Sequence, residues 1–534
     1  MKSYIKLLTL GALMTAASAC TDLDTPVNGY YTEYPNNPAA LEGKLQGCYS
    51  SFQTTLCRDY KELVLLSSDE FFPISFDGDY KDPRYANSYL HMCTGDEANA
   101  NGVYSSLSGG IVYCNRVILE LIGTDGTGEE PLIAPVRAIR AFYHFMLMDL
   151  YGDVPILNRN YADGEAIERM PRAEVAKFIE KELLAAIPDL TEDNNNNTYG
   201  KPNKWMAEAL LVKLYLNWGV YTNNITDVDN NTANEKLNDC VKWCDELAKS
   251  GIFEVGTGYR QKFFPDNGVQ TKDFIYSTAY NADNGHDWDR YFQFRQNKGS
   301  YKSYWGFELT QSCGGNIKVN PYMVDLLTAL PGDERARTII GGPVYMFDEK
   351  YDITDEPFIY KGEQLVLTKD IALKSFDSEL NVGKNINGWS QGYECVKYPI
   401  NNTYNTHGRR QTNDIPIFRF ADILLSKAEC ILRGATATNG DTPASLMNQV
   451  RRCSGAPDVA GTPTLQDLLD ERGREFFAEI WRRNDLIRFG QYENERLHVK
   501  AINPNALTDK NMRLFPIPIG TMNTNTNWKQ NPGY

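Results

Sequence analysis

The chain reads RAIRAFYHFMLMDLYGDVPIL at residues 137–157, and this stretch indicates how the protein folds. Apolar side chains such as Ala138 and Phe142 recur at the three- and four-residue spacing of an amphipathic helix. Gly152 follows the last turn and a proline comes three residues later, which is a common way for a helix to end. The sequence therefore predicts a helix over residues 135–151.

Five further segments carry the same helical spacing. They are residues 172–187, 203–218, 234–249, 417–432 and 465–488. Small residues stand between the leucines, and polar, Asn-rich or Gly-rich loops separate the segments. This arrangement is typical of helical hairpins that stack like tetratricopeptide repeats. We therefore predict a mainly α fold built on a tetratricopeptide-like helical-hairpin scaffold.

Residues 251–415 interrupt this helical pattern. They are rich in Gly, Asn, Asp and Tyr, and they contain short β-type runs at residues 274–279 and 364–367. A connection this long without regular structure is rare inside a compact domain unless it performs a task. We therefore expect a long irregular, partly β insert that carries the ligand site.

The last helical segment also predicts which of its polar side chains are structural. One stripe at helical spacing holds Leu469, Phe476, Ile480 and Ile487, so we expect this face to be buried. Glu479 precedes Arg482 and Arg483 by three and four residues, which is the spacing of helical ion pairs. We therefore expect Arg482 and Asp485 to form structural ion pairs rather than to act in catalysis.

The composition excludes several classes of protein. Hydrophobic residues make up 42% of the 534 residues and charged residues 23%, so the chain can bury a large core and is not disordered. The only strongly apolar run lies at the N-terminus and is too short to span a bilayer. The net charge of −15 disfavours nucleic acid as a partner, because an acidic surface repels polyanions.

The N-terminus has the features of an export signal. Lys2 and Lys6 precede an apolar run over residues 7–17. Residues 17–19 read ASA, a small-residue cleavage site, and Cys20 follows at once. Ordinary secretion is one interpretation, and a lipobox whose cysteine is acylated after cleavage is the other, which we favour. Acyl chains on Cys20 would anchor the mature chain to a membrane surface without spanning it.

The sequence lacks most of the common catalytic and cofactor-binding motifs. It has no H-E-x-x-H, Walker or G-x-G-x-x-G pattern, and it has only five histidines. We expect His144 to be packed, and Cys240 and Cys244 to be buried thiols although their spacing also allows a metal site. Acidic pairs such as Asp69 and Glu70 are expected by chance among 69 acids. We therefore assign no catalytic residue, metal or cofactor.

Four segments together resemble the SusD/RagB family of outer-membrane nutrient-binding lipoproteins. They are RAIRAFYHFMLMDLYGDVPIL (137–157), FRFADILLSKAECILR (418–433), ERGREFFAEIWRRNDLIRFG (471–490) and LFPIPIGTMNTNTNWKQNPGY (514–534). The resemblance spans nearly the whole mature chain and implies a SusD-like fold, in which a helical scaffold carries a variable insert with the ligand site.

This resemblance sets the expected domain organisation. We expect residues 1–19 to be a lipoprotein signal peptide and residues 20–534 to form a single SusD-like domain. Within that domain we expect N-terminal helical repeats at 20–250, the loop-rich insert at 251–415, and a C-terminal helical part with the terminal motif at 416–534.

The resemblance also implies a function. It implies a surface-exposed outer-membrane lipoprotein, lipidated at Cys20, that captures oligosaccharide or polysaccharide and delivers it to a SusC-like TonB-dependent transporter without cleaving it. RagB-like capture of peptides is the alternative of the same class. A glycoside hydrolase that uses one of the acid pairs, and an assembly scaffold without a small ligand, are the alternatives from other classes.

Two aromatic-rich stretches are the candidate ligand surface. Residues 288–307 contain eight aromatic side chains in 20 positions, and residues 71–89 contain six in 19. The apolar face of a sugar ring stacks on an aromatic plane, while its hydroxyls bond to polar side chains. In the family that the chain resembles, the ligand cradle draws on a loop at this N-terminal place and on the central insert.

The individual roles follow from the side-chain types. We expect stacking on sugar rings by Tyr80, Tyr85, Trp288, Tyr291, Tyr304 and Trp305, and hydrogen bonds from Asp77, Arg84 and Arg290. The core is expected to take Phe71, Phe72, Phe292, Phe294 and Phe307, because phenylalanine has no polar group. Packing in the core is the alternative for the tyrosines and tryptophans, and Trp389 and Tyr393 are lesser candidates for binding.

Overall fold

The computed structural model describes residues 38–122, 130–162, 164–280, 303–309, 315–360, 362–406 and 411–534. The chain divides into a unit of residues 1–46, of which residues 38–46 are described as the start of helix α2 (Pro38–Thr55), and a unit of residues 47–534. The predicted signal peptide and Cys20 lie outside the described residues. Among those described, no helix is both long enough and apolar enough to cross a bilayer.

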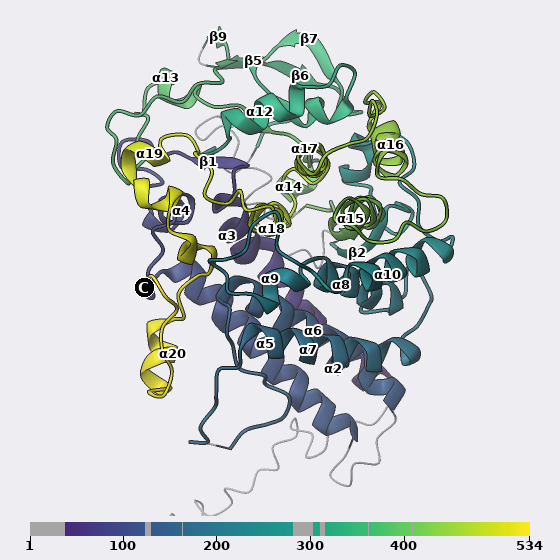
Figure 1. Ribbon diagram of the computed structural model, residues 1–534. Helices are drawn as coiled ribbons and strands as arrows, with labels where there is room; N and C mark the ends of the chain where they lie inside the picture. The colour runs from purple at the N-terminus through teal and green to yellow at the C-terminus, as the bar shows by residue number, and fades with distance from the viewer. Residues whose placement is uncertain are drawn as a thin grey trace, which may run out of the picture. The chain divides into compact units, whose positions relative to one another are not determined.

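Successive helices pack against one another in the N-terminal half of the second unit (Figure 1). They are α5 (Ala98–Ile122), α6 (Glu130–Tyr151), α7 (Arg172–Ala186), α8 (Lys204–Leu216) and α10 (Leu237–Lys249). Every residue from 138 to 151 of α6 is buried, because α5 and α7 both pack against this helix. This confirms the predicted helical-hairpin scaffold.

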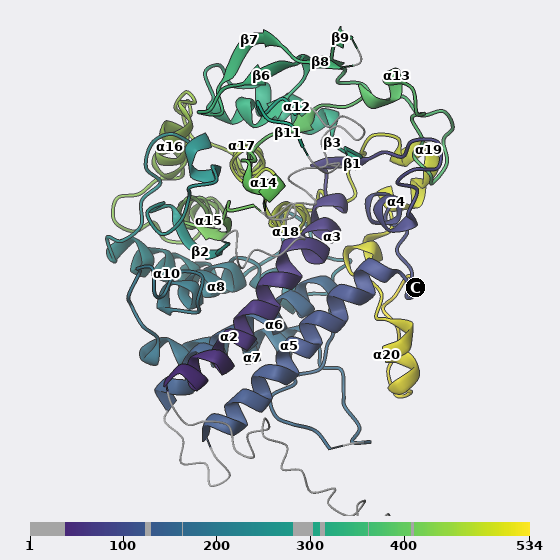
Figure 2. The ribbon, with the colours of Figure 1, turned by 180° about the vertical axis from the view of Figure 1, so that it is seen from behind.

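The C-terminal helices extend the same scaffold. α15 (Phe420–Leu432) packs against α8 and α10, and also against α16 (Pro443–Ser454) and α17 (Leu465–Glu475). Thr442 and Thr464 begin α16 and α17 with capping boxes, and Gly455, at φ 70°, ends α16. Helices from the two ends of the chain therefore lie side by side, as the views from the front and from behind show (Figures 1 and 2).

The strands that the structure describes are short, and they form two-stranded antiparallel sheets. β1 (Phe71–Pro73) pairs with β3 (Ile317–Val319), and β2 (Phe274–Thr278) pairs with β12 (Ile415–Arg419). The remaining pairs are β4 (Ile339–Ile340) with β11 (Glu394–Cys395), β5 (Gly342–Pro343) with β10 (Val366–Leu367), β6 (Tyr345–Phe347) with β7 (Ile353–Pro357), and β8 (Ile359–Tyr360) with β9 (Glu363–Gln364). The expected partly β character of the insert is confirmed.

Short helical turns connect these parts. They are a π-helix (Leu56–Tyr60), α3 (Lys61–Leu66), α4 (Pro83–Leu90), α9 (Trp218–Thr222), α12 (Pro321–Thr328), α13 (Ile386–Trp389), α14 (Thr403–Thr406), α18 (Arg482–Arg488), α19 (Val499–Ile502), α20 (Ile519–Thr524), and 3-10 turns at Ile187–Asp189, Arg260–Phe263, Glu334–Thr338, Pro504–Leu507 and Lys510–Arg513. In Figure 1 the strands β5, β6, β7 and β9 lie at the top of the view.

Two predicted helices differ from the structure. The segment at 417–432 begins as the end of β12, and its helix starts only at Phe420. The segment at 465–488 is two helices, α17 and α18, separated by a break. In this break Ala478 has a left-handed φ of 61°, and its N–H donates to Glu70 Oε1 at 2.8 Å. A carboxylate from far away in the sequence therefore fixes the break, although all four side chains of the predicted stripe are buried.

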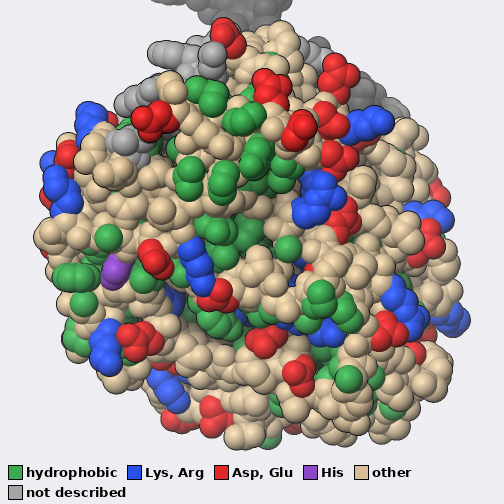
Figure 3. Space-filling model, turned by 90° about the horizontal axis from the view of Figure 1, so that it is seen from above, with side chains coloured by type: hydrophobic (Ala, Val, Ile, Leu, Met, Phe, Trp, Pro, Cys, Tyr) green, Lys and Arg blue, Asp and Glu red, His purple; other side chains and the backbone are tan. Residues whose placement is uncertain are grey.

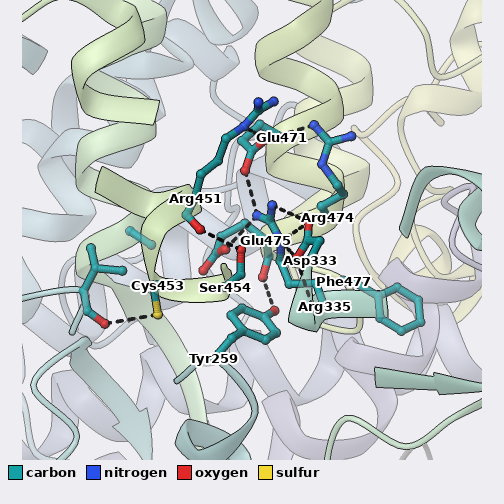
Figure 4. A network of polar contacts seen from close by, with 12 residues as sticks. Tyr259, Asp333, Arg335, Arg451, Cys453, Ser454, Glu471, Arg474, Glu475 and Phe477 are labelled. Atoms are coloured by element: carbon teal, nitrogen blue, oxygen red, sulfur yellow. Dashed lines mark hydrogen bonds and ion pairs between the residues drawn. The ribbon is translucent and has the colours of Figure 1, made fainter. Parts of the chain in front are cut away.

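Buried ion pairs connect the C-terminal helices to the insert (Figure 4). Arg335 Nη1 lies 2.7 Å from Glu471 Oε1 and 3.1 Å from Glu475 Oε2. Arg451 Nε and Arg474 Nη2 each lie 2.8 Å from the other oxygen of Glu471. Every one of these carboxylates is therefore paired inside the protein, which offsets the cost of burying its charge.

The predicted structural role of Arg482 and Asp485 is confirmed, but the partners differ. Arg482 Nη2 pairs with Asp69 Oδ2 at 2.7 Å, and Asp485 pairs with two other arginines. Glu479, expected to pair with Arg482, instead has its Oε1 2.7 Å from Lys397 Nζ. The helix break at Ala478 explains the exchange, because it removes the helical spacing on which the expected pair depends.

The predicted buried groups are found where expected. His144 is fully buried; its Nδ1 contacts the Arg140 carbonyl oxygen at 2.8 Å, and its Nε2 accepts from the Leu157 N–H at 3.1 Å. Burial lowers the pKa of His144 to about 3, so the ring is neutral. Cys240 and Cys244 are buried free thiols, as predicted.

Candidate ligand-binding surface

The strands and loops of the insert form one face of the second unit, seen from above in Figure 3. Apolar side chains gather around the middle of this face, with acidic and basic side chains among them. The N-terminal stretch at 71–89 reaches the insert because β1 pairs with β3. Residues far apart in the sequence are thus brought together here.

Asp77 lies at an exposed turn and holds a loop of the insert in place. Its Oδ1 accepts from Lys374 Nζ at 2.7 Å and from Asn381 Nδ2 at 3.1 Å, and its Oδ2 accepts from the Lys384 N–H at 3.1 Å. The hydrogen bond from Lys374 lowers the pKa of Asp77 and favours its charged form. The sequence predicts that Asp77 binds ligand hydroxyls, whereas in the structure its oxygens position residues 374–384.

Tyr80 is half-buried beside this turn. Its ring meets Phe76 edge-on with centroids 6.3 Å apart, and Phe76 stacks on Trp389 at 4.2 Å. Tyr80 has a left-handed φ of 57°, a costly conformation for a bulky residue, and Asp77 has one of 43°; such conformations cluster at functional sites. Because Tyr80 is only partly buried, its stacking role stays a prediction.

Tyr85 is less accessible than its predicted role requires, and the half-buried Arg84 packs against it. Tyr85 is only 4% exposed, and the Arg84 guanidinium lies over its ring at 4.8 Å. Arg84 Nη2 donates to the Tyr85 hydroxyl at 2.8 Å, and Arg84 Nε lies 3.6 Å from Glu62 Oε1. The core-packing alternative therefore applies to Tyr85, because its ring offers no open face to a sugar.

Tyr304 and Trp305 are also placed in the interior, which corrects the expectation that they stack on a sugar. Tyr304 is 1% exposed and Trp305 is 6% exposed. The Tyr304 hydroxyl donates to Glu394 Oε2 at 3.1 Å, so its polar group finds a partner inside the protein. The Trp305 ring packs on Phe347 at 4.4 Å. An apolar cluster of the insert, which includes Phe347 of β6, Tyr360 of β8 and Leu367 of β10, buries both rings.

Trp288, Arg290 and Tyr291 lie outside the described residues, so their roles stay predictions. Among the described residues, Phe376 is a ring that the sequence analysis missed; it is 62% exposed and lies 5.4 Å from His498. A count of aromatic residues along the sequence does not single out Phe376, because its neighbours in the sequence are mostly polar. The position of its loop depends on the hydrogen bond from Lys374 to Asp77, two residues that are 297 positions apart in the sequence.

Glu70 and Glu208 are buried carboxyls whose pKa values are raised. Burial raises the pKa of Glu70 well above its ordinary value and that of Glu208 to about 7. Glu70 accepts from the Ala478 N–H, and Glu208 is 2% exposed. A general acid must reach the glycosidic oxygen of its substrate, and neither carboxyl is open to a ligand on the surface.

Two family models match the chain. Residues 272–534 match the SusD family, and residues 79–216 match a family described as starch-binding associating with outer membrane. The starch-binding protein SusD of Bacteroides thetaiotaomicron is 25% identical to this chain over 433 residues. The matched part covers 75% of this chain and 72% of that protein.

Solved structures share the architecture. A SusD homologue from Bacteroides thetaiotaomicron has a TM-score of 0.71 at 19% identity, covering 94% of this chain and 98% of that one. Surface glycan-binding protein A from the same organism, solved in complex with laminarihexaose, has a TM-score of 0.67 at 16% identity, covering 92% and 99%. The fold is therefore that of the SusD superfamily. Together with the two family models, this shows that the chain belongs to the SusD/RagB family.

Proposed function

We propose that this protein captures glycans at the cell surface and does not cleave them. The observation that carries the proposal is the match to a starch-binding relative, SusD, over 72% of that protein's length. The fold agrees with this role, because a packed helical scaffold holds a loop-rich face whose shape can vary without loss of the core.

The chemistry of the loop-rich face supports a sugar as the ligand. Phe376 is largely exposed, and Tyr80 is half-buried beside the loop that Asp77 holds. Lys374 and Lys384 belong to this loop and contact Asp77, three residues before Tyr80. Aromatic planes beside hydrogen-bonding groups suit the apolar face and the hydroxyls of a pyranose.

The ligand surface that we propose combines this turn with the central insert. Tyr80 and Arg84 contribute from the N-terminal stretch, with Asp77 positioning the loop. Trp288, Arg290 and Tyr291 are proposed as the contribution of the insert, on the basis of their sequence alone. Tyr85, Tyr304 and Trp305 support the surface from the interior, since all three are buried.

We further propose that the protein is an outer-membrane lipoprotein, anchored through acylated Cys20, that passes its ligand to a SusC-like TonB-dependent transporter. The lipobox-like sequence before Cys20 supports the anchor. The match of residues 79–216 to a family described as associating with the outer membrane supports the location.

Isothermal titration of the full mature chain against a panel of oligosaccharides tests the proposed function. The panel contains maltoheptaose, laminarihexaose, cellohexaose, xylohexaose and oligogalacturonate. We expect at least one of them to bind without release of new reducing ends, and we expect Trp288→Ala to weaken that binding by about 10-fold, since stacking on an aromatic ring contributes about this much.

Each other outcome contradicts part of this proposal. Binding of peptides but of no glycan would favour peptide capture, and release of reducing ends that a single carboxylate substitution abolishes would show a hydrolase. If no glycan or peptide binds while a transporter is still co-purified, the protein is an assembly scaffold. Unchanged glycan affinity in Trp288→Ala would remove Trp288 from the ligand surface but leave the function intact.

A further inference from the structure

A cavity of about 550 Å³ lies beside the turn between β6 and β7. Its lining includes Phe264, Asp266, Glu349, Lys350, Tyr351 and Asn401. None of its lining residues belongs to the stretches at 71–89 or 374–384, so it is separate from the Asp77 turn. A volume of this size is ordinary for small-ligand sites.

Two half-buried aromatic rings form adjoining walls of this cavity. The centroids of Phe264 and Tyr351 are 4.8 Å apart, and the ring planes meet at 62°. Because the planes are not parallel, they form a corner rather than a closed stack. A ring with an apolar face can lie on one plane while its edge contacts the other.

Contacts from several elements fix the Tyr351 side of this corner. Tyr351 has a left-handed φ of 62°, a costly conformation for a bulky residue that persists only where the surroundings hold it. Its N–H donates to the Asp348 carbonyl oxygen at 3.0 Å, and its own carbonyl oxygen accepts from Arg260. Trp305 packs against the Tyr351 ring at 6.1 Å. The ring is therefore preorganised for a ligand.

Polar groups surround the two rings. Burial, together with the nearby carboxylate of Asp266, raises the pKa of the Tyr351 hydroxyl, which therefore keeps its proton as a donor. Asn401 adds an amide to the lining. Such groups can donate to and accept from sugar hydroxyls.

The charges around the cavity give an acidic ligand no net attraction. Asp352 is paired with Arg260 at 3.1 Å and with Arg337 at 2.6 Å. Of the remaining charged groups of the lining, Asp266 and Glu349 are negative and only Lys350 is positive. With Arg260 and Arg337 counted beside Asp352, the negative and positive groups balance, so no excess positive charge attracts a carboxylated or sulfated sugar and the surroundings suit a neutral one.

We propose that this cavity is a second saccharide subsite, specific for neutral sugars, in which Phe264 and Tyr351 stack on the ligand. The subsite rests on the proposed glycan-binding function and extends it, because it assigns the ligand class and a place on the insert. It also gives the buried Trp305 a role, since Trp305 positions the Tyr351 ring without touching the sugar.

Titration of the full mature chain and two variants tests the subsite. Tyr351→Asn removes the ring, and asparagine tolerates the left-handed backbone, so the fold is retained. Tyr322→Asn is the matched control, because Tyr322 is 46% exposed on α12 and has no part in this cavity. The probes are maltoheptaose, laminarihexaose and cellohexaose as neutral oligosaccharides, and oligogalacturonate as the acidic one.

We expect Tyr351→Asn to weaken binding of the neutral oligosaccharide by about 10-fold and Tyr322→Asn to leave it unchanged. Thermal unfolding of the two variants checks that both remain folded. Tyr351→Phe keeps the ring and should lose less affinity than Tyr351→Asn.

The failure of the subsite is distinguishable from that of the proposed function. If the wild type binds a neutral oligosaccharide and Tyr351→Asn binds it equally well, the subsite is refuted and the function stands. If the wild type binds no oligosaccharide of the panel, the function fails and the subsite with it. Tighter binding of oligogalacturonate than of every neutral probe would refute the proposed preference for neutral sugars.

Discussion

Replacing Arg419 with methionine is expected to lower the free energy of unfolding by about 3–5 kcal/mol, the cost of leaving buried charges without their partner. Arg419 is 1% exposed. Its Nη1 lies 2.7 Å from Asp273 Oδ2 and 2.7 Å from Glu475 Oε1, and its Nη2 lies 3.0 Å from Glu479 Oε1. Removing one guanidinium therefore leaves three buried carboxylates short of a counter-charge.

Denaturant unfolding measures this loss as a shift of the midpoint. Arg452→Met is the matched control, because Arg452 is exposed and, in the described part of the chain, pairs with the exposed Asp458. Its free energy of unfolding should therefore stay within about 0.5 kcal/mol of the wild type. The loss of unfolding free energy in Arg419→Lys should fall between those of the other two variants, since an ammonium keeps the charge but cannot bridge three carboxylates. A loss below about 1 kcal/mol in Arg419→Met would show that the network is not essential to the fold.

Acidification is expected to destabilise the protein as the pH falls from about 4.5 towards 2. Burial alone raises the pKa of Glu471, but Arg335, Arg474 and Arg451 outweigh burial and lower the pKa to about 2 from an ordinary 4.5. Between these two pH values the unfolded chain binds the proton that folded Glu471 does not. This contribution to stability is therefore present above pH 4.5 and is lost as the pH falls through the folded pKa.

Chemical denaturation at pH 7, 5 and 3 measures this dependence. A shift of this size corresponds to a contribution on the order of 3 kcal/mol from Glu471, most of which should be gone near pH 2. Glu471→Gln should be less stable than the wild type at pH 7 and should show a shallower decline with acid. Equal slopes for the two proteins between pH 5 and pH 3 would contradict this assignment.

The helical scaffold could be predicted from the sequence because its signal is local. The apolar spacing through residues 137–151 places one helix without any knowledge of its neighbours, and α6 is found there. The break at Ala478 could not be predicted in this way. It depends on the carboxylate of Glu70, which lies 408 residues earlier in the sequence.

The candidate site could be predicted less well, because burial in the insert depends on contacts that are distant in the sequence. Tyr304 and Trp305 stand in an aromatic-rich stretch, which also suits an exposed platform. What buries them is an apolar cluster that includes Phe347 and Phe358. Tyr351 is the converse case: it stands among charged residues, and only its contacts with Phe264 and Trp305 show that its ring lines a cavity.

Hydrogen–deuterium exchange with and without a bound oligosaccharide tests most directly whether the loop-rich face is the binding surface. With the tightest oligosaccharide of the panel, we expect slower exchange in peptides from residues 71–89 and 251–415. Peptides from α5, α7 and α10 should exchange at the same rate with and without ligand. Protection confined to these scaffold helices would contradict the account, because it would place the ligand on the frame rather than on the insert.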